Sequence, residues 1–194
     1  DREVERLLAQ FPLQRPPIAA DVGDAVDIGS LREIEPASGK VLRKRPLAKT
    51  VFGEGLTILN GEMFVLTWKE NTAYVFEPDT FKPIRSHTYQ GEGWGLTNDG
   101  KQLIMSDGTS TLKFINPADF SVVRTVEVKR GKQPVSQINE LEMAGGEIYA
   151  NIYQTDEIVR ISPDTGAVTG SLDLSALRKQ FQQLPNSGRA EAMN

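Results

Sequence analysis

The sequence predicts an all-β protein, a β-propeller built from four-stranded antiparallel blades. A hexapeptide with proline at its third position occurs four times, and the prolines lie 42, 39 and 46 residues apart. Runs of strand-forming residues separated by tight turns precede the last three copies. A repeat of roughly 40–45 residues is typical of a propeller blade. An immunoglobulin-like sandwich also has short strands, but it does not predict a repeat of this length.

The four hexapeptides have the chemistry of a turn. Their proline fixes φ, and Asp, Ser, Thr or Gly follows it to close the loop. They cover residues 34–39, 76–81, 115–120 and 161–166. Each joins two short runs rich in β-forming residues, as Ala73–Phe76 shows before the second copy. We therefore expect each hexapeptide to connect the third and fourth strands of a blade.

A second set of tight turns joins the first two strands of each blade. Asn60-Gly61, Asn98-Asp99-Gly100 and Ala144-Gly145-Gly146 each separate two runs of β-forming residues. Steps of the Asn-Gly and Asp-Gly type are strong hairpin signals. Each unit thus consists of strand, tight turn, strand, loop, strand, proline turn and strand.

This organisation predicts a single propeller domain over residues 1–194. Its expected parts are an atypical N-terminal segment with a loop over 11–20 (1–28), a partial blade (29–52), three blades (53–174), and a short helix with the start of a missing last blade (175–194). Ser175 or Asp173 is the expected N-cap of the helix. Four hexapeptides account for about four blades, so we expect an open gap in the ring.

Composition excludes several functional classes. The 194 residues include no cysteine and one histidine, His87, which excludes thiol catalysis, disulfide frameworks and zinc fingers. No apolar run is long enough to span a membrane. With 26 acidic and 22 basic residues and no basic stripe, nucleic acid is not an expected partner. The chain begins at Asp1 without Met, so we expect that a targeting peptide has been removed.

Four aromatic residues lie where the predicted inner strands begin or end: Phe52, Trp68, Trp94 and Tyr153. Ligands of propellers bind where these strands converge. Two interpretations remain open for the four side chains. They either pack between blades or form an aromatic pocket that holds an apolar group or an amine.

Glu54 is the candidate for acid–base chemistry. It lies among these aromatics between Gly53 and Gly55, and a desolvated carboxylate has a raised pKa that suits proton transfer near neutrality. The alternative is a solvated loop carboxylate. Asn139 is a candidate ligand-binding amide or a turn residue. We interpret Asp107-Gly108 as a hairpin turn and His87 as a surface residue.

Several strings resemble the plant and bacterial type of glutaminyl-peptide cyclotransferase. They are Phe52–Thr57, Gly93–Leu96, Ser106–Ser110, Asn139–Glu142 and Ala150–Asp156, in order between Gly29 and Asn194. The resemblance implies a five-bladed propeller that converts the N-terminal glutamine of peptides or proteins to pyroglutamate and releases ammonia. It implies no required cofactor or catalytic metal, allows a structural calcium in the channel, and suggests a secreted or periplasmic monomer.

The resemblance also assigns roles to the candidate residues. Glu54 corresponds to the proton-transferring glutamate and Asn139 to a substrate-binding amide. The substrate-binding aromatics of the family correspond to Phe52, Trp68, Trp94 and Tyr153. Tyr153 stands where the family usually has tryptophan. A Phe-Thr-Gln-Gly-Leu segment of the family is missing within 13–28, and the chain ends before a C-terminal lysine. A non-catalytic propeller that binds peptides is the alternative function, and a metal-dependent lactonase-type enzyme is a distant third.

Overall fold

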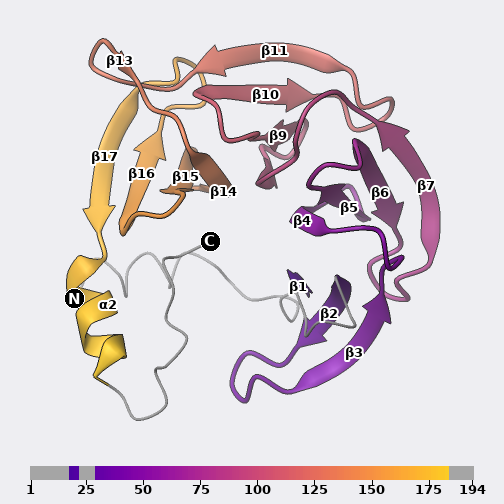
Figure 1. The fold of residues 1–194 in the computed structure, drawn as a ribbon. Helices are drawn as coiled ribbons and strands as arrows, with labels where there is room; N and C mark the ends of the chain where they lie inside the picture. Colours follow the sequence, from indigo (N-terminus) through magenta and orange to yellow (C-terminus); the bar gives the residue numbers. More distant parts are fainter. Residues whose placement is uncertain (1–17, 22–28, 184–194) are drawn as a thin grey trace.

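The computed structural model describes residues 18–21 and 29–183, which form four main antiparallel sheets arranged around a common centre (Figure 1). The first sheet contains β1 (Ile18–Asp21), β2 (Ser30–Ile34) and β3 (Val41–Pro46). The second contains β4 (Gly53–Leu59), β5 (Glu62–Thr67), β6 (Thr72–Phe76) and β7 (Pro83–Thr88). The all-β, propeller-type fold predicted from the repeats is confirmed.

The other two main sheets have the same four-stranded order. The third contains β8 (Leu96–Asn98), β9 (Leu103–Met105), β10 (Thr111–Ile115) and β11 (Val122–Glu127). The fourth contains β14 (Ile138–Ala144), β15 (Glu147–Ile152), β16 (Glu157–Ile161) and β17 (Val168–Asp173). In each, chain order runs from the innermost strand to the outermost, so β4, β8 and β14 line the centre (Figure 1).

Two smaller elements complete the described chain. A two-stranded hairpin, β12 (Lys129–Arg130) and β13 (Gln133–Pro134), connects β11 to β14. The helix α2 (Ser175–Gln182) follows β17. Of the two expected capping residues, Asp173 accepts a hydrogen bond from the N–H of Ser175 at 2.8 Å. No helix among the described residues is long and apolar enough to cross a membrane.

The four hexapeptides form one and the same turn. In each, the N–H of the sixth residue donates to the carbonyl of the second at 2.8 or 2.9 Å. The sixth residue has positive φ, and it is Gly39, Phe81, Phe120 or Gly166. Glycine adopts this conformation at no steric cost, whereas phenylalanine adopts it only with steric strain. Both phenylalanine side chains are buried, and their burial offsets the strain.

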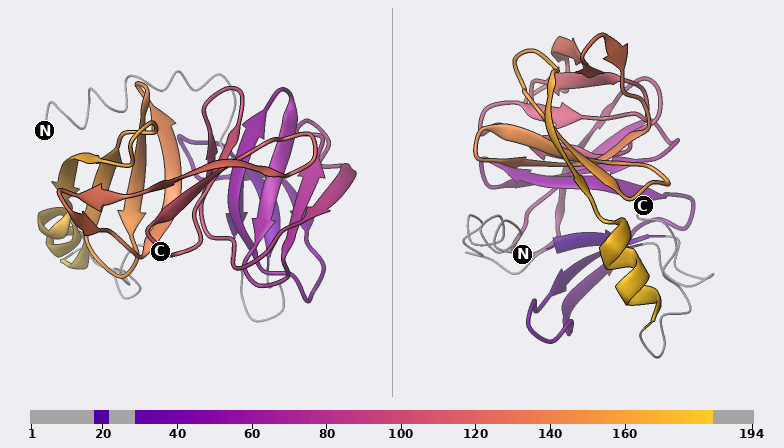
Figure 2. Two further views of the ribbon diagram at one scale, coloured as in Figure 1. Left: turned by 90° about the horizontal axis from the view of Figure 1, so that it is seen from above. Right: turned by 90° about the vertical axis from the view of Figure 1, so that its left-hand side faces the viewer.

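The hydrophobic core is divided among the interfaces between neighbouring sheets, which pack face to face (Figure 2). β5 shows how the sequence produces this arrangement. Met63 and Val65 belong to the core shared with the first sheet, whereas Phe64 and Leu66 belong to the core shared with the third. All four are fully buried, because successive residues of a strand point to opposite faces and both faces are covered.

Glycines allow the inner strands to approach one another closely. The N–H of Gly55 on β4 donates to the carbonyl of Trp94 at 2.7 Å, and a Cβ at Gly55 would lie 2.4 Å from the nitrogen of Leu96. A Cβ at Gly95 would lie 2.2 Å from the carbonyl oxygen of Asn139, near the start of β14. These two glycines bring the beginnings of three inner strands together, where the candidate residues lie.

One expectation near the N-terminus is wrong. Residues 18–20 were expected to belong to a loop, but they form part of β1, which pairs with β2 from Ile18↔Glu33 to Asp21↔Ser30. Backbone pairing with β2 determines the conformation there, although the segment has no alternating apolar pattern. The expectations for residues 1–17, 22–28 and 184–194 lie outside the described residues.

Candidate functional site

The predicted site residues lie at one end of the sheets. The close approach of Gly55 to Gly95, and of Gly95 to Glu140, aligns the three inner strands. These three positions are preceded in the sequence by Glu54, Trp94 and Asn139, respectively. The three candidates therefore occupy equivalent positions in three consecutive sheets, a relationship that the different residue types hide in the sequence.

The aromatic candidates form two contacting pairs. The ring centroids of Phe52 and Trp68 lie 5.7 Å apart with their planes tilted by 60°. Those of Trp94 and Tyr153 lie 5.3 Å apart in an edge-to-face arrangement. All four side chains are half-buried, so each ring keeps a part that is open to solvent. Such pairs are a stable geometry for aromatic rings and leave ring surface for a ligand.

Glu92 joins the two pairs. The indole N–H groups of Trp68 and Trp94 both donate to its Oε2 atom, at 2.8 and 2.9 Å. These hydrogen bonds, first that from Trp94 and then that from Trp68, hold the pKa of Glu92 below its usual range. The four rings of Phe52, Trp68, Trp94 and Tyr153 thus form one continuous arrangement, which we call the aromatic wall.

The Asp107-Gly108 segment supports the aromatic wall. Gly108 has φ of +78°, and a Cβ there would lie 2.7 Å from Cζ2 of Trp94. Asp107 forms an ion pair with Lys113 at 2.9 Å and accepts hydrogen bonds from the backbone N–H and hydroxyl of Thr109. The segment is a turn, as expected, and its glycine also makes room for the indole of Trp94.

Glu54 has the electrostatics expected of a proton-transferring carboxylate. The residue is half-buried at the start of β4. Burial, followed by the negative charge of Glu140, raises its pKa from 4.5 to about 7. A carboxylate with this pKa is partly protonated and partly ionised near neutral pH, so it can both accept and donate a proton.

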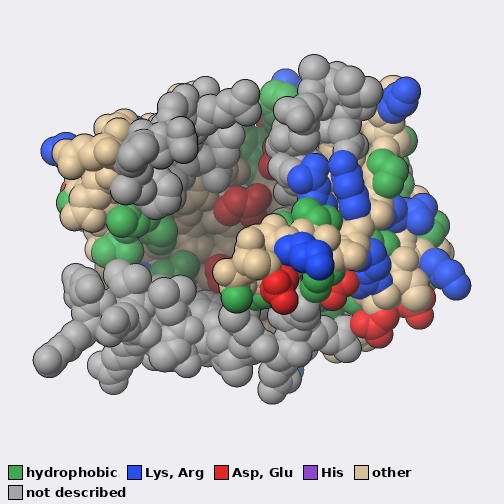
Figure 3. All heavy atoms as spheres, turned by 90° about the horizontal axis from the view of Figure 1, so that it is seen from below, with side chains coloured by type: hydrophobic (Ala, Val, Ile, Leu, Met, Phe, Trp, Pro, Cys, Tyr) green, Lys and Arg blue, Asp and Glu red, His purple; other side chains and the backbone are tan. Residues whose placement is uncertain are grey.

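Glu140 and Glu142 extend the acidic character along β14. Burial among protein atoms and the charge of Glu142 raise the pKa of Glu140 to about 7, although Glu140 remains open to water on this innermost strand. Burial also raises the pKa of Glu142. Figure 3 shows acidic side chains on the inner surface of a hollow in the molecule. The carboxylates near the centre therefore favour their protonated forms more than surface carboxylates do.

Asn139 is held in place through its backbone. Its carbonyl accepts a hydrogen bond from the hydroxyl of Ser106 at 2.6 Å, and the next residue, Glu140, donates its N–H to Oδ1 of Asn151 at 2.8 Å. Asn139 is 7% exposed, so it is part of the packed rim and not a solvated turn residue. The turn interpretation is wrong, because Asn139 lies within β14.

Within residues 18–21 and 29–183, no three His, Cys, Asp or Glu side chains gather so that they could hold a metal ion. Calcium requires six to eight oxygen ligands. Backbone carbonyl and side-chain amide oxygens also serve as calcium ligands. The structural calcium that the resemblance allows therefore stays an expectation, and no chemical step is assigned to it.

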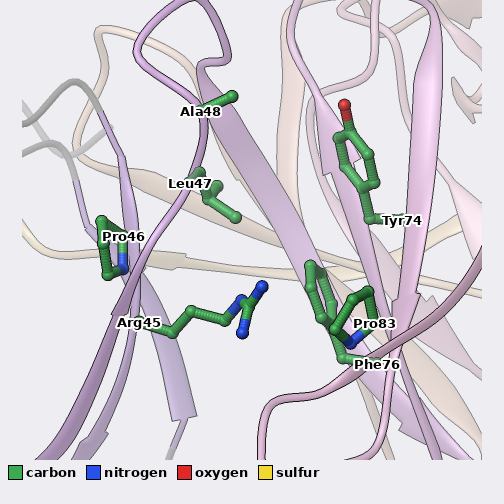
Figure 4. Close-up of a pocket in the computed structure, with 7 residues that line it drawn as sticks. All are labelled: Arg45, Pro46, Leu47, Ala48, Tyr74, Phe76 and Pro83. Carbon is green, nitrogen blue, oxygen red and sulfur yellow. The ribbon is translucent and has the colours of Figure 1, made fainter.

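Two further features lie away from the aromatic wall. A pocket of about 160 Å³ between the first two main sheets is lined by Arg45, Pro46, Leu47, Ala48, Tyr74, Phe76 and Pro83 (Figure 4). It contains none of the candidate residues. His87, expected on the surface, is half-buried on β7, where its ring stacks on Phe120 at a centroid distance of 5.6 Å. His87 is thus a packing residue between sheets.

The sequence interpretation did not assign roles to Glu92 and Glu140. Glu92 precedes Trp94 by two residues, and that spacing places side chains on the same side of an extended chain. Glu140 follows Asn139 in a string of alternating acidic residues that enters a strand. Both carry weak signals in the sequence, because their contacts are made with residues from other sheets.

Comparisons with known proteins show which family the chain resembles. Residues 23–194 match the family model described as glutamine cyclotransferase. A curated Arabidopsis thaliana protein, glutaminyl-peptide cyclotransferase, is 38% identical over 153 residues, which are 77% of this chain and 47% of that protein. The chain therefore spans about half the length of this curated relative.

Solved structures give the same result. The crystal structure of Myxococcus xanthus glutaminyl cyclase superposes with a TM-score of 0.79 and is 35% identical, covering 87% of this chain and 71% of that one. The WD40 β-propeller domain of Doa1 has a TM-score of 0.56 at 12% identity and covers 81% of this chain and 50% of that one. The second likeness concerns the fold alone.

Proposed function

Because the chain belongs to the glutamine cyclotransferase family, we propose that it carries the active site of an acyltransferase that cyclises N-terminal glutamine. The substrates are peptides or proteins with glutamine at their N-terminus, and the products are the pyroglutamyl chain and ammonia. The observation that carries this proposal is a half-buried Glu54, with a pKa of about 7, beside the aromatic wall.

The reaction needs proton transfer more than it needs a nucleophile from the protein. The α-amine of the substrate attacks the side-chain carboxamide carbon, so a C–N bond forms within one residue at a high effective concentration. The attacking nitrogen loses a proton, and the departing nitrogen gains one when its C–N bond breaks and ammonia leaves. Ionised Glu54 accepts the first proton and protonated Glu54 supplies the second, so the enzyme returns to its starting state.

The remaining candidates bind and orient the substrate. Phe52, Trp68, Trp94 and Tyr153 present ring surface that excludes water and attracts an amine. We assign the amide of Asn139 to hydrogen bonding with polar groups of the substrate. Its position in register with Glu54 supports this assignment. Tyr153 replaces a tryptophan of the family with a smaller ring, which leaves more room beside Trp94.

Other properties follow from the resemblance and are part of the proposal. We expect turnover without a cofactor, a monomeric enzyme, and a secreted or periplasmic location. The domain is assigned as one five-bladed propeller in which 29–52 belong to a partial blade and 53–174 to three blades, and β1 (18–21) joins the partial blade through its pairing with β2. The four-stranded sheets β4–β7, β8–β11 and β14–β17 support this division.

The test is product analysis with a matched pair of peptides. A peptide with N-terminal glutamine is expected to release ammonia and lose the corresponding mass, whereas the same peptide with N-terminal glutamate is expected to release none. Addition of a chelator is expected to leave the rate unchanged. Binding of the glutamine peptide without ammonia release by a folded chain would instead support the non-catalytic binding module, which neither the family nor the relatives' names favour.

A further inference from the structure

A single carboxylate oxygen of Glu92 accepts hydrogen bonds from two tryptophans. Oε2 of Glu92 accepts the indole N–H of Trp68 at 2.8 Å and that of Trp94 at 2.9 Å. The other carboxylate oxygen lies 4.0 Å from Nζ of Lys69, at the outer limit of an ion pair. Hydrogen bonds to an ionised acceptor are the strong ones, so the indoles are the main partners of this carboxylate.

The backbone fixes Glu92 between these partners. The N–H of Gly93 donates to the carbonyl of Trp68 at 3.0 Å, and the carbonyl of Gly91 accepts from Nδ2 of Asn71 at 2.5 Å. Gly91 has positive φ, and the hydroxyl end of Tyr89 lies against Gly93, where it leaves no room for a Cβ. Both neighbours of Glu92 are therefore anchored, so the backbone of Glu92 has a fixed position between the two sheets.

The two tryptophans come from different sheets. Trp68 follows β5 in the second sheet, whereas Trp94 precedes β8 in the third. Without a common partner, each indole could rotate about its own side-chain bonds, since both are half-buried. The ring contacts of Trp68 with Phe52 and of Trp94 with Tyr153 hold each pair together but do not connect one pair to the other.

We propose that Glu92 is a positioning residue that sets the distance and angle between Trp68 and Trp94, and thereby the shape of the substrate-binding aromatic wall. The inference rests on the proposed function for its effect on turnover, but the fixing of the indoles does not depend on it. Glu92 acts through the tryptophans, so its loss weakens capture of the glutaminyl residue more than it slows ring closure.

Two variants test the role of Glu92. Glu92→Ala removes the acceptor, whereas Glu92→Gln keeps a carbonyl oxygen at nearly the same place without the charge. Glu70→Ala is the control, since Glu70 is an exposed carboxylate on the same rim, two residues after Trp68. Thermal unfolding of all variants is measured first, so that an unfolded protein is recognised.

The first readout is the indole N–H resonances in a ¹⁵N–¹H correlation spectrum. The chain contains two tryptophans, so two resonances report on this contact alone. Both are expected to move upfield in Glu92→Ala, less in Glu92→Gln, and not at all in Glu70→Ala. Unchanged resonances in a folded Glu92→Ala protein would overturn the positioning role, whether or not the chain turns over a substrate.

The second readout is the kinetics with a peptide that has N-terminal glutamine. Glu92→Ala is expected to raise KM about tenfold or more with kcat changed far less, because the carboxylate no longer fixes the indoles of Trp68 and Trp94 by hydrogen bonds. Glu92→Gln is expected to recover part of the loss. If the indole resonances move but KM stays at the wild-type value, the link to substrate binding is wrong. If the wild type shows no turnover, the proposed function fails while the first readout still decides the positioning role.

Discussion

Glu140, on β14 of the fourth sheet, raises the pKa of Glu54, on β4 of the second sheet. The effect adds to that of burial, and the two together bring the pKa of Glu54 to about 7. The third sheet separates the two residues in the sequence, but Gly55 and Gly95 bring the three inner strands into contact. The pKa of Glu54 thus depends on a carboxylate more than eighty residues away in the sequence.

The first prediction is the loss of activity on removal of the Glu54 carboxylate. Glu54→Gln is nearly isosteric, so the fold is expected to remain, whereas a positioned acid–base group contributes about 10²–10⁴ in rate. Ammonia release from a peptide with N-terminal glutamine measures the effect. Glu77→Gln, at an exposed turn, is the control and is expected to keep the full rate. A folded Glu54→Gln chain with a normal rate would remove Glu54 from the mechanism.

The second prediction concerns the pH dependence of the reaction. The proton-accepting form of Glu54 is the ionised one, so kcat/KM is expected to rise with pH up to a limb near pH 7. In Glu140→Gln the repelling charge is absent, the pKa of Glu54 falls, and the limb moves to lower pH. Burial of Glu54 is the larger cause, so the limb remains above the ordinary value of 4.5. A limb at the same pH in both proteins would mean that the two carboxylates do not interact.

Much of the fold could be predicted because each blade repeats local signals. Asn60-Gly61 and the four proline turns determine hairpins through their own backbone preferences, and both neighbouring strands follow from them. β1 and the hairpin β12–β13 could not be predicted in this way. Ile18–Asp21 and Lys129–Pro134 have no alternating apolar pattern, and pairing with other segments determines their conformation.

The residue types of the candidate site could be proposed from the sequence, whereas the contacts between them could not. Glu54, Trp68 and Trp94 could be proposed as candidates from their position at strand ends, and Glu54 and Trp94 also from the family strings. Glu92 gave no comparable signal, since its role depends on the side-chain geometry of two sheets at once. The effect of Glu140 on Glu54 depends on the close packing of inner strands, which only the structure reveals.

The third prediction is that a rise in pH lowers the stability of the folded chain over the same range in which it raises the activity. In the folded chain the pKa of both Glu54 and Glu140 is about 7, whereas the ordinary value is 4.5. The folded state therefore binds more protons than the unfolded state between these values, and the free energy of unfolding falls as pH rises from about 4.5 to about 7. His87 has a lowered pKa and acts in the opposite direction below its ordinary value of 6.5.

Comparison of two proteins isolates the effect of the carboxylates. Urea unfolding of the wild type and of Glu140→Gln is measured from pH 4.5 to pH 8, and both proteins keep His87. The stability difference is expected to shift in favour of Glu140→Gln as pH rises, because the variant has no carboxylate at position 140 whose ionisation the folded chain disfavours. A difference that is constant with pH would show that Glu140 titrates as an ordinary surface carboxylate.

The fourth prediction distinguishes substrate binding from packing for the tryptophans. Trp68→Ala and Trp94→Ala are each expected to raise KM roughly threefold to thirtyfold, the range of an aromatic contact with an amine. The remaining tryptophan in each variant should also change its fluorescence, because Glu92 loses one of its two indole partners. A large drop in melting temperature with an unchanged KM would assign that tryptophan to packing between sheets.

The last prediction concerns Gly108, which lies against Trp94. Gly108 has φ of +78°, and a Cβ there would lie within 3.0 Å of three atoms of the indole of Trp94. Gly108→Ala is therefore expected to strain the backbone and to displace the indole. Gly100→Ala is the matched control, because Gly100 has φ of +87° and nothing lies within 4 Å of its Cβ position.

Both alanine variants are expected to lose stability, by about 1 kcal/mol for the backbone conformation alone. Only Gly108→Ala is expected to change the fluorescence of Trp94 and to raise KM for a glutaminyl peptide, because only there does the new methyl group meet a residue of the aromatic wall. The measurements are urea unfolding, the emission spectrum and initial rates. If both variants behave alike in all three, the position of Trp94 does not depend on Gly108, and the glycine is required by its turn alone.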